Sequence, residues 1–139
     1  MSFESTRTVR FADCDPAGIV FFPQYLVMLN TLVEQWFEDG LGIPYADFVG
    51  RRRCGLPTVR IEVDFRAISR HGDLLRLRLG VERAGRSSLT LRHDLFGADA
   101  VRLSARQVLV CTSLDTHRPQ ALPDDVRAAM QPYVEESAP

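Results

Sequence analysis

The sequence places two carboxylates one residue apart, Asp13 and Asp15, directly before a Pro-Ala-Gly segment and a run of apolar residues. A carboxylate can attack an electrophilic carbon as a nucleophile, or draw a proton from water as a general base. Asp15 begins an Asp-Pro-Ala-Gly segment that suits a type I turn, so its carboxylate has a purely structural use as well. Taken alone, an Asp-Pro turn is structural far more often than catalytic, so the residues themselves leave the role of Asp15 open. Asp13 lies on the Val9–Phe11 face of a predicted strand, and we assign it a structural role.

A helix is predicted to begin at Pro23, a few residues after this pair. The first N–H groups of a helix have no partner within it, and the positive end of its dipole lies there. Such groups can stabilise the oxyanion that forms when a nucleophile adds to a carbonyl. Pro23 has no N–H, so the backbone amide of Phe22 is the predicted donor, with those of Gln24 and Tyr25 nearby.

The composition excludes several other kinds of chemistry. All 17 basic residues are arginine, which removes lysine nucleophiles and Schiff bases. Against 18 acidic residues they leave a net charge of −1, which disfavours nucleic acid as a partner. The three cysteines show no metal-type spacing, so no metal site is expected. Cys14 lies between two acidic residues, which would raise the pKa of its thiol and disfavour its use as a nucleophile.

The remaining titratable groups are less suited to this site. His71 and His117 lie in loop-like segments and are predicted to face solvent, whereas His93 follows the inward phase of a strand and is predicted to be buried. Glu34 offers a rival carboxylate on the predicted helix. It lies roughly 16 Å along the helix axis from the helix start, too far to share an oxyanion site within one subunit.

The strongest predicted element is a helix from Pro23 to about Asp39. Apolar residues recur there at spacings of three and four, which predicts burial on more than one side; they are Phe22, Tyr25, Leu26, Met28, Leu29, Leu32, Val33, Trp36 and Phe37. Gly40 is the predicted left-handed cap. A first strand is predicted over Thr6–Asp13.

From Pro57 the apolar period changes from 3.6 to 2, which predicts strands. They cover about 59–65, 75–81, 89–95 and 100–112, and a change of parity in the last suggests a bulge near Gln107. Strands consecutive in the chain are expected to pair antiparallel. A loop or short irregular helix is predicted over 42–56, and a last helix from Pro123 to near Glu135.

These elements predict one two-layer α+β domain covering residues 1–139, in which a curved antiparallel sheet wraps around one long central helix. Apolar residues make up 45% and charged residues 25%, an ordinary balance for a globular protein. No apolar run approaches the ~18 residues that a membrane span needs. The first residues show no secretory signal pattern, and we expect a cytoplasmic protein.

The segment from Phe11 to Tyr25, FADCDPAGIVFFPQY, closely resembles the signature of the 4-hydroxybenzoyl-CoA thioesterase-like family of hotdog-fold acyl-CoA thioesterases. The resemblance continues in order along nearly the whole chain, through Gly72-Asp73, the hairpin segment from Gly85 to Ser88, and Pro123-Asp124. It implies hydrolysis of an acyl-CoA thioester without a metal or other cofactor. It also implies a homodimer or homotetramer with active sites at the subunit interface.

The resemblance further implies roles for individual residues. Asp15 occupies the position of the catalytic carboxylate, acting as nucleophile or general base. Asn30 and Tyr25 are predicted to line the acyl pocket, and an aromatic helix start is compatible with an aromatic or a short aliphatic acyl group. The other substrate-binding residues implied are those of a hairpin placed near the pantetheine and phosphates of CoA: Arg86, Ser87 and Ser88. We expect the run Arg51-Arg52-Arg53 to be solvated loop rather than a CoA contact.

Two other functions are considered. The first is a noncatalytic protein that binds acyl thioesters, which retention of Asp15 argues against. The second is a hotdog hydratase or dehydratase. That reaction needs a carboxylate–histidine pair, and no histidine stands near Asp15 or the helix start in the sequence.

Overall fold

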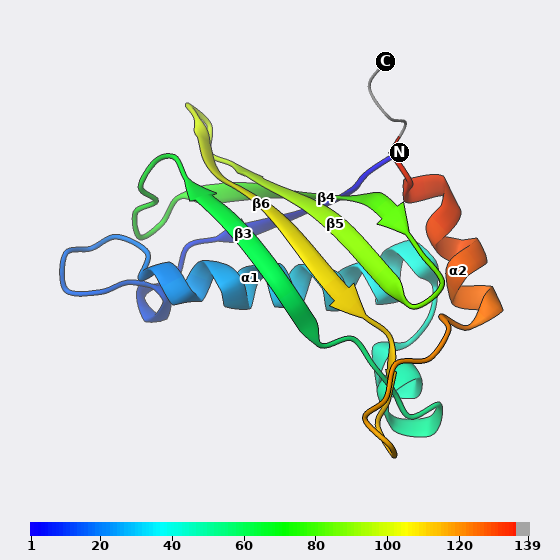
Figure 1. The fold of residues 1–139 in the computed structure, drawn as a ribbon. Helices are drawn as coiled ribbons and strands as arrows, with labels where there is room; N and C mark the ends of the chain where they lie inside the picture. Colours follow the sequence, from blue (N-terminus) through cyan, green and yellow to red (C-terminus); the bar gives the residue numbers. More distant parts are fainter. Residues whose placement is uncertain (136–139) are drawn as a thin grey trace.

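The computed structural model describes residues 1–135, and Figure 1 shows one long helix lying along one face of an antiparallel sheet. The sheet has the spatial order β1-β4-β5-β6-β3, and its strands are β1 (Phe3–Thr8), β3 (Thr58–Phe65), β4 (Leu74–Ala84), β5 (Ser88–Phe96) and β6 (Val101–Val110). The helix, α1, covers Phe22–Gln35. The predicted two-layer α+β hotdog arrangement is confirmed.

Smaller elements close the end of the sheet beyond the last turn of α1. The two-residue strands β2 (Cys54–Gly55) and β7 (Thr112–Ser113) pair with each other, and α2 (Asp124–Met130) is followed by a 3-10 turn over Gln131–Tyr133. The predicted short helix between residues 42 and 56 is a helical turn over Asp47–Arg51. Figure 1 shows α2 beside the far end of α1, away from the helix start.

The sheet and α1 bury each other because their apolar periods match. In β4, Leu75, Leu77 and Leu79 are buried while Leu74 and Arg76 are exposed. The predicted stripe on α1 is buried against that face at Tyr25, Met28, Leu29, Leu32 and Val33. Each such side chain contributes roughly 1.5–3 kcal/mol by leaving water. Phe22 is the exception to the predicted stripe, since it is 58% exposed.

The strand order differs from the predicted neighbour pairing at one point. β3 and β4 are consecutive in the chain, but β3 pairs with β6 and β4 with β5. The segment that joins them therefore crosses from one edge of the sheet to its interior. This connection, residues 66–73, forms walls of the candidate site described below.

The prediction of a first strand over Thr6–Asp13 is wrong in its bounds. β1 ends at Thr8, and Phe11–Asp13 forms a 3-10 turn. The carboxylate of Asp13 accepts the backbone N–H of Arg10 at 2.8 Å, which closes this turn and ends the strand. Phe11 does not share a buried face with Val9 but is 80% exposed.

The prediction of Gly40 as the left-handed cap is also wrong. After Gln35 the helix widens into a π-helical turn over Trp36–Leu41, which carries the chain one turn further. The left-handed residue is Gly42, with φ of 69°. Gly40 instead packs closely against Trp36 and Tyr133, where a side chain would not fit.

β6 has no bulge at Gln107. Its inward positions continue without a shift through Leu103, Ala105, Gln107 and Leu109, so a polar side chain occupies a core position. The register of the ladder shifts elsewhere, in the β3–β6 pair between Thr58 and Arg60 and in the β5–β6 pair between Leu95 and Phe96. The predicted burial of His93 is confirmed, and its Nε2 lies 2.8 Å from Oε1 of Gln107, which explains the inward glutamine.

Candidate active site

The Asp15 turn folds back on itself just before α1. The Gly18 N–H donates to the Asp15 carbonyl at 2.9 Å, and the Asp15 N–H donates to the Ile19 carbonyl at 3.0 Å. Gly18 has φ of 79°, a left-handed conformation that glycine adopts without strain. The Asp15 carboxylate accepts the Ala17 N–H at 2.8 Å, which is the predicted turn contact. Its other oxygen makes no hydrogen bond to the described residues. The turn therefore fixes the carboxylate in place and leaves one of its oxygens able to accept a further hydrogen bond.

Asp13 has the structural role that the sequence predicts. It is buried, and its carboxylate accepts hydrogen bonds from the Arg7 guanidinium at 2.9 Å and the Arg10 N–H at 2.8 Å. Its backbone carbonyl accepts the Phe21 N–H at 2.9 Å. Asp13 therefore ties β1 to the residue that precedes α1.

The start of α1 offers the predicted free donor. Gln24 donates its N–H to the Phe21 carbonyl at 2.8 Å, while the Phe22 N–H has no hydrogen-bond acceptor among the described residues. Because it lies in the first turn, this amide has no partner within the helix and points along the positive end of the dipole. Phe22 can therefore stabilise a nearby negative charge, as an oxyanion donor must.

Two cavities flank the segment that joins Asp15 to Phe22. A cavity of about 510 Å³ includes Asp15 in its wall, and the other lining residues are Phe11, Cys14, Pro16, Gly18 and His71. A second cavity of about 280 Å³ includes Phe22, and is lined further by Ile19, Val20, Tyr25, Phe65, Arg66, Ala67 and Ile68. Within one chain the carboxylate and the proposed oxyanion donor thus line adjacent cavities. An isolated antiparallel bridge between Cys14 and Val20 closes the segment whose residues line both cavities.

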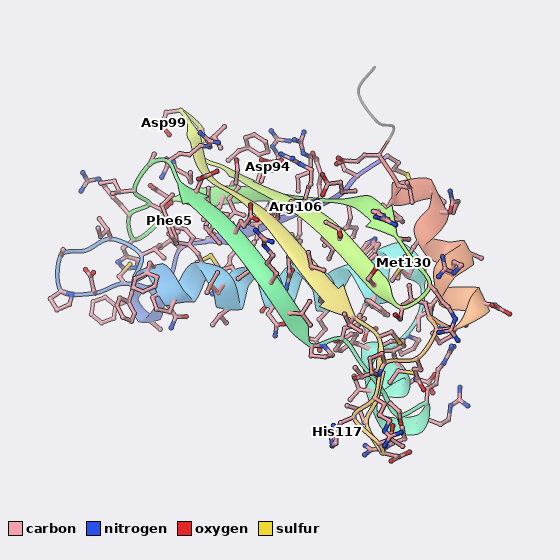
Figure 2. All side chains as sticks on the ribbon, viewed as in Figure 1. Phe65, Asp94, Asp99, Arg106, His117 and Met130 are labelled. Atoms are coloured by element: carbon pink, nitrogen blue, oxygen red, sulfur yellow. The ribbon has the colours of Figure 1, made fainter. Side chains whose placement is uncertain are left out.

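Aromatic rings form much of the second cavity. Phe22 meets Phe65 edge to face, with ring centroids 6.1 Å apart, and Tyr25 lies 5.9 Å from Phe65. The Tyr25 hydroxyl is buried and donates to Oγ of Ser69 at 2.9 Å. Figure 2 shows Phe65 at the end of the molecule where α1 begins. This cavity suits a flat apolar group, and Tyr25 is one of its lining residues; its role in binding the acyl group stays a prediction.

His71 is a residue of the candidate site that sequence reasoning missed. It was predicted only to face solvent, and it is exposed, but it also lines the Asp15 cavity. Its backbone N–H lies 3.4 Å from the Gly18 carbonyl, and its ring lies edge-on to Phe11 at 5.9 Å. The two segments are 53 residues apart in the chain. The statement that no histidine stands near Asp15 therefore holds only along the sequence.

Cys14 has no features of a nucleophile. Burial, followed by the carboxylates of Asp13 and Asp15, raises the pKa of the Cys14 thiol. Its Sγ donates to the Arg10 carbonyl at 3.5 Å. The rise in pKa agrees with the sequence prediction, although burial contributes more than the acidic neighbours.

Arg86, Ser87 and Ser88 do not meet Asp15 within one chain. They form the hairpin after β4, whose 11 residues span roughly 33 Å from the end of the strand that lies near His71. The hairpin is held there by α2, because the Arg127 guanidinium donates to the carbonyls of Gly85 and Arg86. A composite site would need these residues from a second copy.

The two polar residues predicted or considered on α1 lie away from Asp15. Asn30 is exposed on the helix, and its side chain makes no hydrogen bond to the described residues. Glu34 lies close to the far end of the helix. There, burial and then the nearby Glu34 carboxylate raise the pKa of Tyr45.

Each arginine of the run 51–53 has a carboxylate partner in its own chain. Arg51 and Arg52 both donate to Asp47, and Arg52 also binds Asp125 through two bonds of 2.8 and 2.7 Å. Arg53 donates to Asp115 at 3.1 Å. These pairs give the run a structural use at the far end of the molecule, and the expectation that it does not contact CoA stays a prediction.

Within residues 1–135, no three side chains of His, Cys, Asp or Glu gather as a metal-ligand set. In the same range no helix has the length and apolar character needed to cross a membrane.

The chain resembles known proteins over almost its full length. Residues 9–130 match the model of the Thioesterase-like superfamily. The 1,4-dihydroxy-2-naphthoyl-CoA hydrolase of Nostoc punctiforme is 31% identical, over 91% of this chain and 84% of that protein. The 4-hydroxybenzoyl-CoA thioesterase of Pseudomonas sp. is 30% identical, over 68% of this chain and 67% of that protein.

Solved structures agree in fold. A 1,4-dihydroxy-2-naphthoyl-CoA thioesterase from Synechocystis superposes with a TM-score of 0.85 at 26% identity, covering 94% of this chain and 96% of that one. A thioesterase-superfamily protein from Jannaschia sp. reaches a TM-score of 0.89 at 24% identity, covering 97% of this chain and 94% of that one. The sequence match and the shared fold together place the protein: the chain belongs to the Thioesterase-like superfamily and is a hotdog-type acyl-CoA thioester hydrolase.

Proposed function

We propose that this protein hydrolyses the CoA thioester of a hydroxylated aromatic acid, with Asp15 as the catalytic carboxylate and the Phe22 amide as the oxyanion donor. The observation that carries the proposal is the incompletely satisfied Asp15 carboxylate, held by its turn beside a helix start whose first N–H is free. A CoA thiolate, with an ordinary thiol pKa of about 8.5, leaves with little acid assistance. The site therefore needs no lysine and no strong general acid.

Two routes use the same geometry. In one, an Asp15 oxygen attacks the thioester carbon, the C–S bond breaks, and water hydrolyses the resulting mixed anhydride. In the other, Asp15 takes a proton from water as that water attacks. In both routes the thioester oxygen becomes negative next to the Phe22 N–H. Label recovered in the Asp15 side chain after a single turnover in ¹⁸O-water would establish the anhydride route, because general-base attack leaves the Asp15 oxygens unchanged.

The aromatic substrate class rests on the second cavity and on the relatives. Phe22, Tyr25 and Phe65 surround a space of about 280 Å³, which fits one or two fused rings better than a flexible chain. The relatives in Nostoc punctiforme and Pseudomonas sp. are named for hydroxylated aromatic acyl groups. We assign the acyl group to this cavity and the thioester to the boundary between the two cavities.

A second copy of the chain is the proposed partner. Large apolar side chains are exposed around the helix start and along the free edge of β3, and they include Phe11, Phe21, Phe22, Val27, Val59, Phe65 and Ile68. An unpaired edge strand beside an apolar surface is a template for association. A two-fold arrangement would cover this surface and would bring Arg86, Ser87 and Ser88 of one copy towards Asp15 of the other.

The first experiment follows free-thiol release from benzoyl-, hydroxybenzoyl-, dihydroxynaphthoyl-, acetyl- and hexanoyl-CoA. Turnover of aromatic thioesters at least tenfold above the aliphatic ones supports the proposal. Binding without thiol release would replace it with a noncatalytic carrier. Because His71 lies in the Asp15 cavity, a 2-enoyl-CoA is included, and gain of water with an intact thioester would indicate a hydratase. Full activity after dialysis against a chelator is expected, since we propose no metal or other cofactor.

A subunit-mixing experiment tests the composite site. Asp15→Asn and an Arg86→Ala/Ser87→Ala double variant are each expected to be poorly active alone. If one copy supplies Asp15 and the other the hairpin, a 1:1 mixture regains about a quarter of the wild-type activity, because half of the dimers are mixed and each has one intact site. Activity that stays at the average of the two parents, in a mixture shown to have exchanged subunits, would overturn the pairing of Asp15 with the hairpin of a second copy.

A further inference from the structure

The connection between β3 and β4 forms walls of both cavities. Ile68 lines the aromatic cavity and His71 lines the Asp15 cavity, only three residues further along. The thioester is assigned to the boundary between the two. A substituent on the ring next to the thioester carbon would therefore project towards the wall that holds His71.

His71 is held firmly although it is exposed. Gly72 has φ of 92° and donates its N–H to the Val9 carbonyl at 2.9 Å, while the Val9 N–H donates to the Asp73 carbonyl at 2.8 Å. These bonds join both sides of the turn to the end of β1. The bridge between Ile19 and Arg70 fixes the other flank against the Asp15 turn.

A buried arginine completes this support. The Arg102 guanidinium donates through Nη1 to the Ile68 carbonyl at 2.7 Å and to Asp73 at 2.9 Å, and through Nη2 to Asp99 at 2.6 Å. The Arg70 N–H and then Arg102 hold the pKa of the Asp73 carboxyl below its usual range. The segment carrying Ile68 and His71 is therefore pre-organised before substrate binds.

Among the residues that line the Asp15 cavity, the imidazole of His71 is the one side chain with N–H groups. Neither of its ring nitrogens makes a hydrogen bond to the described residues, so both remain available. Cys14, the other side chain there with a proton to donate, uses it on the Arg10 carbonyl. A polar group of a substrate in this cavity would thus meet His71 or the Asp15 carboxylate.

We infer that His71 is a specificity-determining residue that hydrogen-bonds a hydroxyl group ortho to the thioester on the aromatic acyl group. This rests on the proposed function. An ortho oxygen lies on the ring carbon next to the one bearing the thioester, so it shares the cavity of the reacting carbon, whereas a para hydroxyl points away into the aromatic cavity. Phe11 lies edge-on to the imidazole and lines the same cavity, which limits the positions that the imidazole can take.

The test compares 2-hydroxybenzoyl-CoA, 4-hydroxybenzoyl-CoA and benzoyl-CoA in wild type and in His71→Phe, which keeps a flat ring but removes both nitrogens. Loss of one hydrogen bond predicts a 5- to 50-fold fall in kcat/KM for the ortho compound. The other two compounds are expected to change less than twofold. His71→Gln, which retains an N–H donor, is expected to restore most of the ortho preference.

His117→Phe is the matched control, because His117 is an exposed loop histidine that lines neither cavity. It is expected to leave all three values unchanged. An equal fall for all three compounds in His71→Phe, or no change for the ortho compound, would overturn the inference.

Equilibrium binding separates this inference from the proposed hydrolysis. Non-hydrolysable carba analogues of the same three thioesters are titrated into wild type and His71→Phe by calorimetry. A weakening of 5- to 50-fold confined to the ortho-hydroxy analogue supports the His71 contact even if no thioester is turned over. Equal affinities for the three analogues in wild type would overturn it whatever the activity.

Discussion

Aromatic side chains are buried at one end of α1 and exposed at the other. At the far end, Trp36, Phe37 and Phe48 are fully buried, with rings of Phe37 and Phe48 5.0 Å apart. At the start of the helix, Phe11, Phe22 and Phe65 are 80%, 58% and 51% exposed. The far end uses its rings to stabilise the fold, whereas the start leaves them for a ligand or a second copy. Within one chain the packed rings and the exposed rings therefore lie at different ends of α1, and substitutions should separate their effects on stability and on activity.

The clearest separation of an effect on activity from an effect on stability is expected between substitutions of Asp15 and of Asp13. Asp15→Asn keeps an oxygen that can accept the Ala17 N–H, so the fold should persist. It removes the charge needed for attack or proton transfer, and kcat is expected to fall by at least ~10³-fold, equivalent to about 4 kcal/mol. Thiol release and a thermal melt measure the two effects. A variant that keeps more than a tenth of the activity would remove Asp15 from the mechanism.

Asp13→Asn is the matched control two residues away. Its carboxylate is buried between Arg7 and the Arg10 N–H, so the variant is expected to lose about 1–3 kcal/mol of stability and most of the charge pairing. Its kcat should remain within about tenfold of wild type under conditions where it is folded. If Asp13→Asn lost activity as completely as Asp15→Asn while remaining folded, the structural role of Asp13 would be wrong.

The second comparison truncates one aromatic ring at each end. Phe48→Ala is expected to lower the free energy of unfolding by about 3–5 kcal/mol, because it opens a cavity in the packed far end. Phe65→Ala is expected to cost about 1 kcal/mol or less, while raising KM for aromatic acyl-CoA substrates severalfold. Urea unfolding and steady-state kinetics measure these effects. Equal losses of stability would contradict the contrast between the ends.

The third prediction concerns the buried histidine of the sheet. Burial lowers the pKa of His93 to about 4, while its ordinary value in an unfolded chain is about 6.5. Between these values the unfolded chain binds more protons, so stability is complete above pH 6.5 and falls as the pH drops towards 4. The loss approaches roughly 3 kcal/mol. Urea unfolding at several pH values should show this slope in wild type.

His93→Gln provides the control for that slope. The variant keeps an amide donor for Gln107 but does not titrate, so its stability should depend less on pH between 6.5 and 4. A change in its stability at neutral pH does not affect the comparison, which rests on the slope alone. An unchanged slope would show that other groups dominate acid unfolding.

The smallest effect is expected from the arginine pairs at the far end. Arg52→Gln removes the paired bonds to Asp125, and because this pair is partly exposed the loss of stability should be below ~1 kcal/mol. KM for acyl-CoA should stay within twofold of wild type, since Arg52 already has two carboxylate partners. A rise in KM of tenfold or more would place this arginine at the CoA phosphates.

The sequence predicts the repetitive parts of this fold well, because burial imposes a period on them. The period of 2 located β3 to β6, and the period of 3.6 located α1. Errors arose where a local pattern had two physical explanations. Val9 and Phe11 alternate as strand residues do, yet the Asp13 carboxylate closes a turn there. Gly40 and Gly42 are both plausible helix caps. Gly40 packs closely against Trp36, and the left-handed cap is Gly42.

The residues of the candidate site also divide into those that a local sequence pattern predicts and those that depend on the tertiary structure. Asp15 and Phe22 could be proposed from the sequence because the chemistry assigned to them depends on a contiguous turn and helix start. His71 could not, because its place beside Asp15 depends on the crossing of the sheet by residues 66–73 and on bonds from Val9 and Gly18. The one local signal was Gly72 next to it, which indicates a turn but not what the turn faces. Whether Arg86, Ser87 and Ser88 join the site depends on a second copy and stays a prediction.

The support given by Arg102 makes the segment 66–73 an exchangeable unit. Its internal conformation depends on Gly72 and Asp73, and its attachment on one guanidinium that reaches a backbone carbonyl and a carboxylate. The residues facing the two cavities, Ile68 and His71, take no part in that attachment through their side chains. Segments from related chains could therefore be transplanted here to change acyl preference without redesigning the core, provided that Asp73 and Arg102 are retained.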